Sequence, residues 1–591
     1  MTSKSRGCNW RHLIFLTSLV LTVQVARAQW STDAGQNFMV CDTLGSQELP
    51  KIAATSDGGC YISWFDTRAS AYRVYMQRLN AQGVKQWEPN GLLISSNPQS
   101  TSLVDWDLAV DDSDNAIVVF TDQRNGTQIN PFAYKIGPQG AFLWGANGVQ
   151  LSNATTVFQA DPKVAKTSDG SFVFVWPYGS SPNQVAMQRL DAAGTKQWGN
   201  DPILISGGAE QRWRPSLVAS DNGSVILLYA AFTGSTISPQ NYKLLTRKVS
   251  PAGTTLWTDT VYALGRVSGF FVPKIFPDGS NGALYVWHDE RGGANSTSYV
   301  QRFTSAGTPL FPLNGSASST LAGRLHNDAW VAHASANNET YMFWYETNSS
   351  TQSIYGVYGQ KFSSNGTRQW ADSGVAFRPF GGGQPSFVRC FARDSAAVVF
   401  YLDGVTVTTN LVRGFKVDRN GTMLWGGSIL DVSSVSSGKG RLGGAFTASG
   451  NSLLAWADKR LDGNGIYAQE LSLTGNLGVV TGLREMIGSE FPVNFSLEQN
   501  YPNPFNPVTT ITYNLPVASR VSIKIYNILG QEVKALLDDV QQLGFNSTVW
   551  DATNTQGNLV STGVYFYRIR ASSLADPARS FTQVKKMMVQ R

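Results

Sequence analysis

The sequence predicts an all-β protein: an eight-bladed β-propeller closed by its N-terminal strand, followed by a small Ig-like β-sandwich. Three observations predict this fold class. One pattern of short strands and tight turns recurs from the start of the mature chain to about residue 478. Each copy ends at a Gly that is usually followed by a Trp. The last hundred or so residues lose this pattern but keep short alternating strands between turn residues, while long helical periodicities are almost absent.

The first 28 residues have the order of a secretory signal peptide. Lys4, Arg6 and Arg11 precede an apolar run from Leu13 to Val23, and Ala26-Arg27-Ala28 offers a cleavage site. An uncleaved anchor is the alternative, but this run is too short to span a bilayer. We therefore expect removal of residues 1–28, and no transmembrane anchor in the mature chain.

Composition excludes some functions and leaves the cysteines open. A net charge of +6 over 591 residues forms no basic stripe, so nucleic-acid binding is not expected. The mature chain holds Cys41, Cys60 and Cys390. In an exported protein Cys41 and Cys60 are close enough in sequence to form a disulfide, which would leave Cys390 free. Three small buried residues are the alternative.

The repeat starts with an apolar run, crosses a polar turn and continues through an aromatic-rich strand and a third strand. The first copy has Lys51-Ile52-Ala53, Ser56-Asp57-Gly58 and Tyr61-Ile62-Ser63-Trp64, and the third repeats it with Lys163-Val164-Ala165, Ser168-Asp169-Gly170 and Phe172-Val173-Phe174-Val175-Trp176. The marker glycines are Gly83, Gly140, Gly194, Gly253, Gly307, Gly366, Gly421 and Gly475. Their spacing of roughly 55 residues lies in the propeller range, so eight markers predict eight blades over residues 29–478.

A Trp lies four residues beyond most marker glycines and predicts how the ring closes. This series comprises Trp87, Trp144, Trp198, Trp257, Trp370 and Trp425, with Phe311 at the fifth position. No aromatic residue follows Gly475 at that distance. The missing element is found at the other end of the chain, where Trp30 precedes Gly35 and Phe38-Met39-Val40. We therefore predict that the N-terminal strand completes the last blade and that Trp30 joins the other Trp residues in a structural docking role.

The Gly-x-x-x-Trp element, as in Gly194-Thr195-Lys196-Gln197-Trp198, resembles the tryptophan-docking motif of quinoprotein dehydrogenase propellers, which have eight blades. Those enzymes place a vicinal cysteine pair at a quinone and bind a metal with carboxylates. No two cysteines are neighbours in this chain. The resemblance therefore implies the packing of the repeats, and we expect no cofactor and no metal.

The repeat pattern stops after Gly478, residues 479–494 form a predicted linker, and residues 495–591 form the predicted sandwich. This last segment contains Asn500-Tyr501-Pro502-Asn503-Pro504-Phe505-Asn506-Pro507, Tyr526-Asn527-Ile528-Leu529-Gly530, Gly563-Val564-Tyr565 and Lys585-Lys586. In combination these motifs resemble the type A C-terminal sorting domain of the type IX secretion system of Bacteroidetes and related phyla, which also resembles an Ig-like domain. The resemblance implies that Asn503, Pro504, Gly530, Gly563, Tyr565, Lys585 and Lys586 belong to the sorting motif. It also implies that an outer-membrane translocon reads the domain, which is commonly removed during transfer. A sandwich that binds carbohydrate or spaces the propeller is the alternative.

Four repeats end their second strand with an Asp and an Arg two residues apart. These are Asp66 and Arg68, Asp122 and Arg124, Asp289 and Arg291, and Asp458 and Arg460. Residues two apart on a strand share a face, so each pair can form an ion pair. With the ring closed, blades eight, one and two are contiguous, so Asp66, Arg68, Asp122, Arg124, Asp458 and Arg460 form a candidate ligand-binding sector. The alternative is that each pair clamps its own turn.

No catalytic motif emerges from the rest of the chain. Asp111-Asp112-Ser113-Asp114-Asn115 lacks the glycine and acidic spacing of a calcium loop and fits a solvated turn. The mature histidines, His288, His326 and His333, have no metal-binding spacing. Acidic loop residues such as Asp289, Glu290 or Glu346 could serve catalysis, because propeller glycosidases draw such residues from separate blades.

These observations predict a propeller that is secreted, or carried on the outer surface of a bacterium, and that binds a polymer, a glycan or a protein. The alternative is a secreted polysaccharide hydrolase or lyase.

Overall fold

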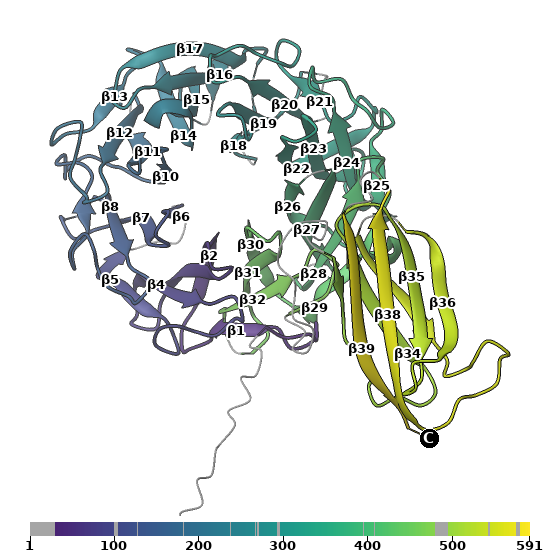
Figure 1. The fold of residues 1–591 in the computed structure, drawn as a ribbon. Coiled ribbons are helices and arrows are strands. Elements are labelled where there is room, and N and C mark those ends of the chain that lie inside the picture. Colours follow the sequence, from purple (N-terminus) through teal and green to yellow (C-terminus); the bar gives the residue numbers. More distant parts are fainter. Residues whose placement is uncertain are drawn as a thin grey trace, which may run out of the picture. The chain divides into compact units, whose positions relative to one another are not determined.

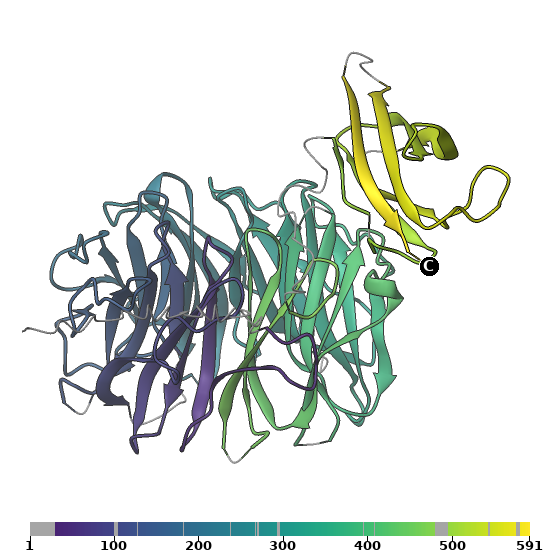
Figure 2. The same cartoon turned by 60° about the horizontal axis from the view of Figure 1, so that its bottom comes forward.

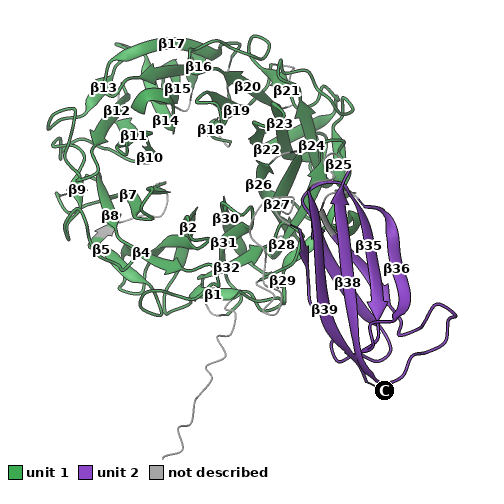
Figure 3. Cartoon of the chain, in the orientation of Figure 1, with its two compact units in different colours: residues 1–481 green, residues 482–591 purple. Residues whose placement is uncertain are grey.

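The structure is a computed structural model that describes residues 30–99, 105–478 and 495–590, apart from 127, 181, 237, 266, 269–270, 292–295, 394, 407, 462, 501, 542–543 and 575–578. The signal peptide expected at 1–28 and the linker expected at 479–494 lie outside the described residues. The chain divides into two compact units, Met1–Thr481 and Gly482–Arg591 (Figure 3).

The described residues of the first unit form eight four-stranded antiparallel sheets, here called blades and numbered along the chain by their innermost strand. The innermost strands are β2 (Gln47–Ala54), β6 (Asp107–Val110), β10 (Lys163–Lys166), β14 (Gln211–Ala219), β18 (Lys274–Pro277), β22 (Arg324–Ala334), β26 (Ser386–Arg393) and β30 (Lys439–Phe446). The second strands are β3 (Cys60–Asp66), β7 (Ala116–Asp122), β11 (Phe172–Tyr178), β15 (Val225–Gly234), β19 (Ala283–Asp289), β23 (Glu339–Asn348), β27 (Ala396–Gly404) and β31 (Ser452–Asp458).

The outer half of each blade is built in the same way. The third strands are β4 (Tyr72–Leu79), β8 (Asn130–Ile136), β12 (Gln184–Leu190), β16 (Pro239–Val249), β20 (Thr297–Phe303), β24 (Tyr355–Phe362), β28 (Asn410–Asp418) and β32 (Gly465–Leu471). The outermost strands are β5 (Leu92–Gln99), β9 (Val149–Gln150), β13 (Ile203–Ile205), β17 (Thr255–Tyr262), β21 (Ser316–Ala317), β25 (Val375–Gly381), β29 (Leu430–Ser437) and, for blade 8, β1 (Phe38–Cys41). Two short 3-10 turns lie between strands: η1 (Asp221–Gly223) connects β14 to β15, and η2 (Trp425–Gly427) lies between β28 and β29.

The eight blades surround a common axis (Figure 1), and Figure 2 shows them side by side after a 60° turn. Innermost strands of successive blades contact each other, and β2 contacts β30, so the ring is closed. The predicted closure by the N-terminal strand is confirmed, because β1 pairs antiparallel with β32, with Phe38 opposite Ala468. The first unit is therefore a closed β-propeller.

Each docking Trp bridges its own blade to the next. The indole nitrogen of Trp30 donates to the Ala81 carbonyl at 3.1 Å. The same bond joins Trp87, Trp144, Trp198, Trp257, Trp370 and Trp425 to the carbonyls of Pro138, Ala192, Pro251, Ser305, Arg419 and Leu473. Each acceptor lies two residues before a marker glycine. A Cβ added to Gly83 would come within 2.8 Å of the Trp30 ring, so glycine allows the close approach of the indole.

Cys41, Cys60 and Cys390 are buried free thiols. The disulfide predicted as one alternative for Cys41 and Cys60 is therefore absent, and the other alternative, small buried residues, describes them. Burial raises the pKa of the Cys41 thiol to about 11, which keeps it protonated and unreactive at neutral pH.

The second unit is a β-sandwich of two sheets around one core. One sheet has the order β33 (Ser496–Leu497), β34 (Thr509–Leu515) and β37 (Gly544–Trp550). The other has the order β36 (Glu532–Gln541), β35 (Ser519–Tyr526), β38 (Gly563–Ser573) and β39 (Ser580–Val589). Apolar residues of both sheets, among them Ile511, Ile523 and Trp550, are fully buried between them.

Within the part of the chain that the structure describes, no helix has the length and apolar character needed to cross a membrane.

Candidate functional site

The four predicted Asp–Arg pairs lie at the ends of the second strands β3, β7, β19 and β31. Because adjacent strands are antiparallel, this is the end of the blade at which the innermost strand begins; Gln47, the first residue of β2, lies opposite Asp66. Blades 8, 1 and 2 are contiguous through β30, β2 and β6. Three of the pairs are thus on neighbouring blades, and the fourth is on blade 5.

Each pair forms a compact clamp. The carboxylate of Asp66 is fully buried and accepts the indole N–H of Trp64 at 2.9 Å and a guanidinium N–H of Arg68 at 2.5 Å. The Arg68 guanidinium also lies 4.0 Å from the centre of the Tyr75 ring and donates to the Asn90 carbonyl at 3.0 Å. The other clamps have the same Asp–Arg ion pair at 2.6 Å and an Arg stacked on an aromatic residue of the third strand: Arg124 on Phe132, Arg291 on Tyr299 and Arg460 on Tyr467.

These contacts are the ones that the turn-clamp alternative predicts. The clamp joins the second strand, the turn and the third strand of one blade, and a buried carboxylate needs such partners to remain ionised. A ligand role for Asp66, Arg68, Asp122, Arg124, Asp458 and Arg460 stays a prediction.

A second group, of charged and aromatic residues, lies nearer the ring axis, on the innermost strands or directly before them. We call it the axial cluster. It consists of Lys51, Asp105, Asp107, Asp161, Lys163, Arg214, Lys274, Asp328, Trp330, Phe387, Arg389 and Arg441.

The backbone of the innermost strands bulges at this cluster. Asp161, Arg214, Asp328, Phe387 and Arg441 have φ values of 47°, 52°, 45°, 51° and 56°, although none of them is glycine. At Arg214, Asp328, Phe387 and Arg441 the pairing with the second strand shifts register. Left-handed conformations of non-glycine residues cost of order 1–3 kcal/mol each and concentrate at functional sites. The repeated bulge is therefore a reason to consider the axial cluster as a site.

One half of the axial cluster is an ion-pair network across blades 1 to 3. Asp105 pairs with Lys51 at 2.7 Å and also with Lys163, and its backbone N–H donates to the Asp161 carboxylate at 2.6 Å. Burial would raise the pKa of Asp105, but Lys163 and Lys51 outweigh it and hold this pKa well below its usual range. Burial raises the pKa of Asp161 and that of Asp107. One site thus contains a firmly ionised carboxylate beside two carboxyl groups that retain their protons more strongly.

The other half of the axial cluster combines cations with aromatic rings. Lys274 pairs with Asp328 at 3.1 Å, and the guanidinium of Arg389 lies 4.1 Å from the centre of the Trp330 ring. Arg441 lies 6.0 Å from the Phe387 ring. Trp330, Phe387 and Arg389 are half-buried, whereas Arg441 is exposed. Such a surface offers hydrogen-bond donors beside apolar ring faces.

Sequence reasoning missed the axial cluster as a site, although it used the Lys51 and Lys163 segments to define the repeat. The residue types change from blade to blade, so no single motif marks them. A usable signal is the Pro-Lys pair that recurs as Pro50-Lys51, Pro162-Lys163 and Pro273-Lys274, within β2 and at the beginning of β10 and β18.

Blade 6 has no Asp–Arg clamp. Glu346 takes the place of the Asp and accepts the Trp344 indole N–H at 3.3 Å, but Asn348 stands where Arg is found in the clamped blades. Its nearest basic side chains are Arg324, at 3.6 Å, and His326, whose Nε2 lies 3.5 Å away. Burial raises the pKa of Glu346 to about 7 and lowers that of His326 to about 4. Since both side chains are only 1% exposed, this pair cannot meet a polymer without movement of the blade.

The other two histidines have partners of their own, since His288 accepts the Ala329 backbone N–H at 3.1 Å and Nδ1 of His333 lies 2.9 Å from the Thr340 hydroxyl. Asp289 is held in its clamp, Glu290 is exposed, and Asp111 closes the turn between β6 and β7 by accepting the Asn115 backbone N–H at 2.9 Å. Among the described residues, no group of three or more His, Cys, Asp or Glu side chains is arranged to hold a metal ion.

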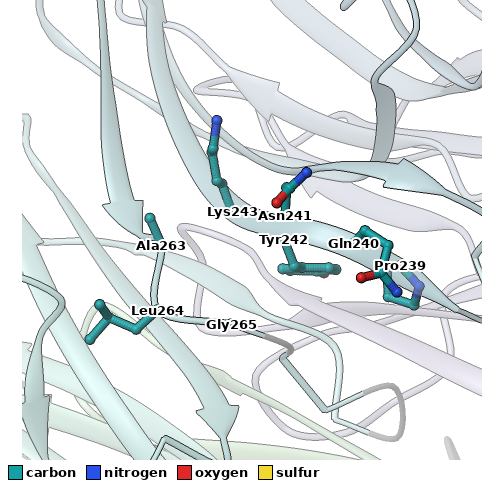
Figure 4. Close-up of a pocket in the computed structure, with 8 residues that line it drawn as sticks. All are labelled: Pro239, Gln240, Asn241, Tyr242, Lys243, Ala263, Leu264 and Gly265. Atoms are coloured by element: carbon teal, nitrogen blue, oxygen red, sulfur yellow. The ribbon is translucent and has the colours of Figure 1, made fainter.

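A pocket of about 400 Å³ lies in the outer half of blade 4, between the beginning of β16 and the segment after β17 (Figure 4). Figure 4 shows the Tyr242 ring beside Gln240 and Pro239, with Ala263 and Leu264 on the facing segment. Tyr242 stacks on Phe232 with ring centres 5.5 Å apart. The pocket is separate in sequence from the axial cluster and from the clamps.

In the sandwich, the predicted sorting-motif residues occupy turns and the β38–β39 edge. Asn503, which precedes Pro504, accepts the Met588 backbone N–H at 2.8 Å, and Gly530 closes the turn between β35 and β36 with φ 75°. Gly563 begins β38, where Tyr565 is buried in the core. Lys585 and Lys586 are successive residues of β39 and therefore belong to opposite faces of the sheet.

Residues 499–589 match the family described as secretion system C-terminal sorting domain. This segment is a type IX C-terminal sorting domain, as its motifs predict. The protein is therefore exported by the type IX route to the outer cell surface or the extracellular space.

A search among curated proteins finds no match to this sequence. Among solved structures, the chain is similar to a family PL25 ulvan lyase, with 10% identity over 76% of this chain and 99% of that chain and a TM-score of 0.43. It is also similar to a Penicillium chrysogenum alpha-L-arabinanase (13% identity, 53% of this chain and 92% of that chain, TM-score 0.29). A Dyadobacter fermentans protein of unknown function has 10% identity over 54% of this chain and 96% of that chain, with a TM-score of 0.32.

Proposed function

We propose that the exported propeller binds a glycan or a related polar polymer through the axial cluster. The observation that carries this proposal is the half-buried set of cations, carboxylates and aromatic rings that the innermost strands bring together around the axis. Sugar hydroxyls bond to carboxylate, ammonium and guanidinium groups, while the C–H face of a sugar ring packs against an aromatic ring.

A matched pair of lysines on one strand allows a direct test. Lys163 begins β10 and belongs to the axial cluster, whereas Lys166 ends β10 and pairs with the exposed Asp112. The mature full-length chain and its Lys163→Gln and Lys166→Gln variants would be titrated with uronate, sulfated and neutral polysaccharides. We expect Lys163→Gln to weaken binding about tenfold, or about 1.4 kcal/mol, and Lys166→Gln to leave it unchanged. Equal affinities of the two variants, or no binding to any polysaccharide, would overturn the proposal.

The second candidate function is cleavage of the polymer. It is favoured by the contrast within one site between Asp105, whose pKa is lowered, and Asp161, whose pKa is raised by burial. Carboxyl groups whose environments push their pKa values apart can divide the roles of charge stabiliser and proton donor. In this reading Asp161 gives its proton to the glycosidic oxygen as the bond from that oxygen to the anomeric carbon breaks, and the ionised Asp105 stabilises the positive charge that develops on the sugar. Water then adds to the anomeric carbon and returns a proton to Asp161.

The two functions differ in whether products are released. If the propeller cleaves its ligand, Asp161→Asn should abolish the appearance of new chain ends while binding persists. If it only binds, neither the natural chain nor this variant should shorten the polymer during a long incubation, as measured by size-exclusion chromatography.

A further inference from the structure

Three sequence motifs of the sorting domain that are far apart in the chain meet in one row across the outward face of its larger sheet. Tyr526 begins the Tyr526-Asn527-Ile528-Leu529-Gly530 motif, Phe566 follows Gly563-Val564-Tyr565, and Lys586 ends the Lys585-Lys586 pair. The strand register places Phe566 opposite Tyr526 on one side and opposite Lys586 on the other.

The same register separates an inward set of residues from this outward row. Tyr565, Tyr567 and Met587 alternate with the outward residues and are 8%, 0% and 0% exposed in the sandwich core. The motifs therefore have two functions: their inward residues build the fold, and their outward residues form a surface that exists only when the domain is folded.

The rows beside Tyr526, Phe566 and Lys586 are cationic and apolar. Arg568 lies opposite both Lys524 and Val584, Arg570 lies opposite Ser522 and Thr582, and Val564 lies opposite Met588. Val584 and Met588 are 52% and 45% exposed, so they add apolar surface to the cationic face.

Carboxylates neutralise only part of this charge. Among the described residues, the outward positions of the sheet carry five cations, Arg520, Lys524, Arg568, Arg570 and Lys586, against two acids, Glu532 and Asp538. Glu532 pairs with Lys524 at 2.9 Å, and Asp538 pairs with Arg520 at 3.2 Å. Arg568 lies 4.8 Å from the centre of the Tyr526 ring. The net positive charge is therefore concentrated around Arg568, Arg570 and Lys586.

We propose that this outward face, centred on Phe566, Arg570 and Lys586, is the surface by which the type IX machinery recognises the folded sorting domain. The partner that fits it is a protein surface with carboxylates flanked by apolar side chains. Carboxylates complement the excess of Lys and Arg, and apolar side chains cover Val564, Val584 and Met588. Because the face is assembled from three strands, recognition requires the fold and not a linear stretch of sequence.

The two neighbouring lysines of β39 provide the test and its control. A linear signal would use Lys585 and Lys586 alike, whereas the proposed face contains only Lys586, since Lys585 lies opposite the core residue Tyr567. Full-length chains carrying Lys585→Gln, Lys586→Gln or Arg570→Gln would be expressed in a bacterium that has the type IX machinery. The extracellular and periplasmic fractions would be quantified by immunoblotting.

We expect Lys586→Gln and Arg570→Gln to lower the extracellular fraction severalfold, their combination to lower it at least tenfold, and Lys585→Gln to have little effect. Thermal unfolding of each purified full-length variant separates loss of recognition from loss of the fold, because the outward substitutions should leave the melting temperature of the sorting domain unchanged.

Two results would overturn the proposal. One is an equal export defect for Lys585→Gln and Lys586→Gln, which would indicate a linear signal. The other concerns lipid. If the purified full-length chain bound vesicles of phosphatidylglycerol, and Lys586→Gln and Arg570→Gln each abolished this binding while export was retained, the face would bind lipid and not the machinery.

Discussion

At the scale of single residues, glycine has two roles in this chain: it adopts backbone conformations with positive φ, and it leaves room for a neighbouring ring. Substitution can separate these roles. Gly83 and Gly170 both have φ near +78°, so alanine is strained at either position. A Cβ at Gly83 would also collide with the Trp30 ring at 2.8 Å, whereas a Cβ at Gly170 would meet nothing within 4 Å.

We therefore expect Gly170→Ala to cost about 1 kcal/mol of unfolding free energy and Gly83→Ala to cost about 3 kcal/mol or more. Urea unfolding of the two variants under the same conditions measures the difference. Equal costs would mean that the Trp30 contact at Gly83 is not tight.

Glu346 makes the unfolding free energy of the first unit depend on pH, and its pKa shift fixes the direction of this dependence. Its pKa is about 7 in the folded protein against an ordinary value of 4.5, so the folded state binds this proton more tightly than the unfolded state does. The stability from this proton is fully present below about pH 4.5 and is lost as the pH rises to about 7. The neighbouring His326, whose pKa is lowered to about 4, acts in the opposite direction between about pH 4 and 6.5.

Comparison with Glu346→Gln isolates the contribution of Glu346. We expect the natural chain to lose up to about 3 kcal/mol relative to this variant between pH 4.5 and 7.5. Guanidinium unfolding midpoints across that pH range provide the measurement, and a constant difference between the two proteins would contradict the assigned environment of Glu346.

At the scale of secondary-structure elements, the clamps coincide with the ends of the second strands. Each clamped second strand, β3, β7, β19 and β31, has seven residues and ends at its Asp. In blades 4 and 6, where Ala231 and Glu346 take the place of the Asp, strands β15 and β23 continue to ten residues. In blade 3, which has Tyr178 in place of the Asp, β11 also has seven residues, so a short second strand does not require the clamp. The buried ion pair and the stacked Arg hold the turn that follows the strand.

The clamp and ligand interpretations make opposite predictions for Asp66, Asp122 and Asp458. Replacement of one of these buried carboxylates by Asn should cost about 3–5 kcal/mol, because the Arg loses its buried partner. For the folded fraction of the triple Asn variant, the clamp interpretation predicts unchanged affinity for a polysaccharide that the natural chain binds. The ligand interpretation predicts that this affinity is lost. Isothermal titration at a temperature well below the melting point decides between them.

Sequence predicted the elements whose residue types are fixed by geometry. Glycine allows the docking Trp to approach closely, so the Gly-x-x-x-Trp element, as in Gly83 and Trp87, recurs at regular intervals along the chain. Trp30 could therefore be recognised as the Trp that the last repeat lacks. The Asp–Arg pairs are visible for the same reason. Axial residues such as Asp161, Arg214 and Phe387 share a backbone position but no chemistry, so no pattern in one sequence marks them. The neighbours of Glu346 come from the innermost strand, as His326 does, and only the fold brings them together.

At the scale of the whole molecule, the chain joins a propeller to a separate export domain. Removal of residues 490–591 deletes the sorting domain and leaves the residues of the ring intact. We expect this truncated chain to accumulate in the periplasm, folded and resistant to protease, because the deletion removes the sorting domain and leaves the propeller. Cell fractionation measures this outcome, and normal delivery of the truncated chain to the cell surface would contradict it.

Closure of the ring affects the whole propeller. The two neighbouring blades position each innermost strand, and the innermost strands carry the axial cluster. The first and last strands, β1 and β32, meet across more than 400 residues of sequence, with Met39 opposite Tyr467. Without β1, blade 8 would expose the edge of β32 and the buried side chains of Val40 and Cys41 would be lost from its core.

Hydrogen exchange at Ile466 and Ala468 therefore tests the account most directly, in a chain that begins at residue 29 and in one that begins at residue 42. Alternate residues of an antiparallel strand bond to opposite neighbours, and these two face β1, whereas Tyr467 faces β31. We predict slow exchange in the longer chain and exchange at least a hundredfold faster at Ile466 and Ala468 in the shortened chain, with the amides of β11 and β12 still protected. Equal protection of these residues in the two chains would contradict closure by the N-terminal strand, and with it the ring on which the proposed binding site depends.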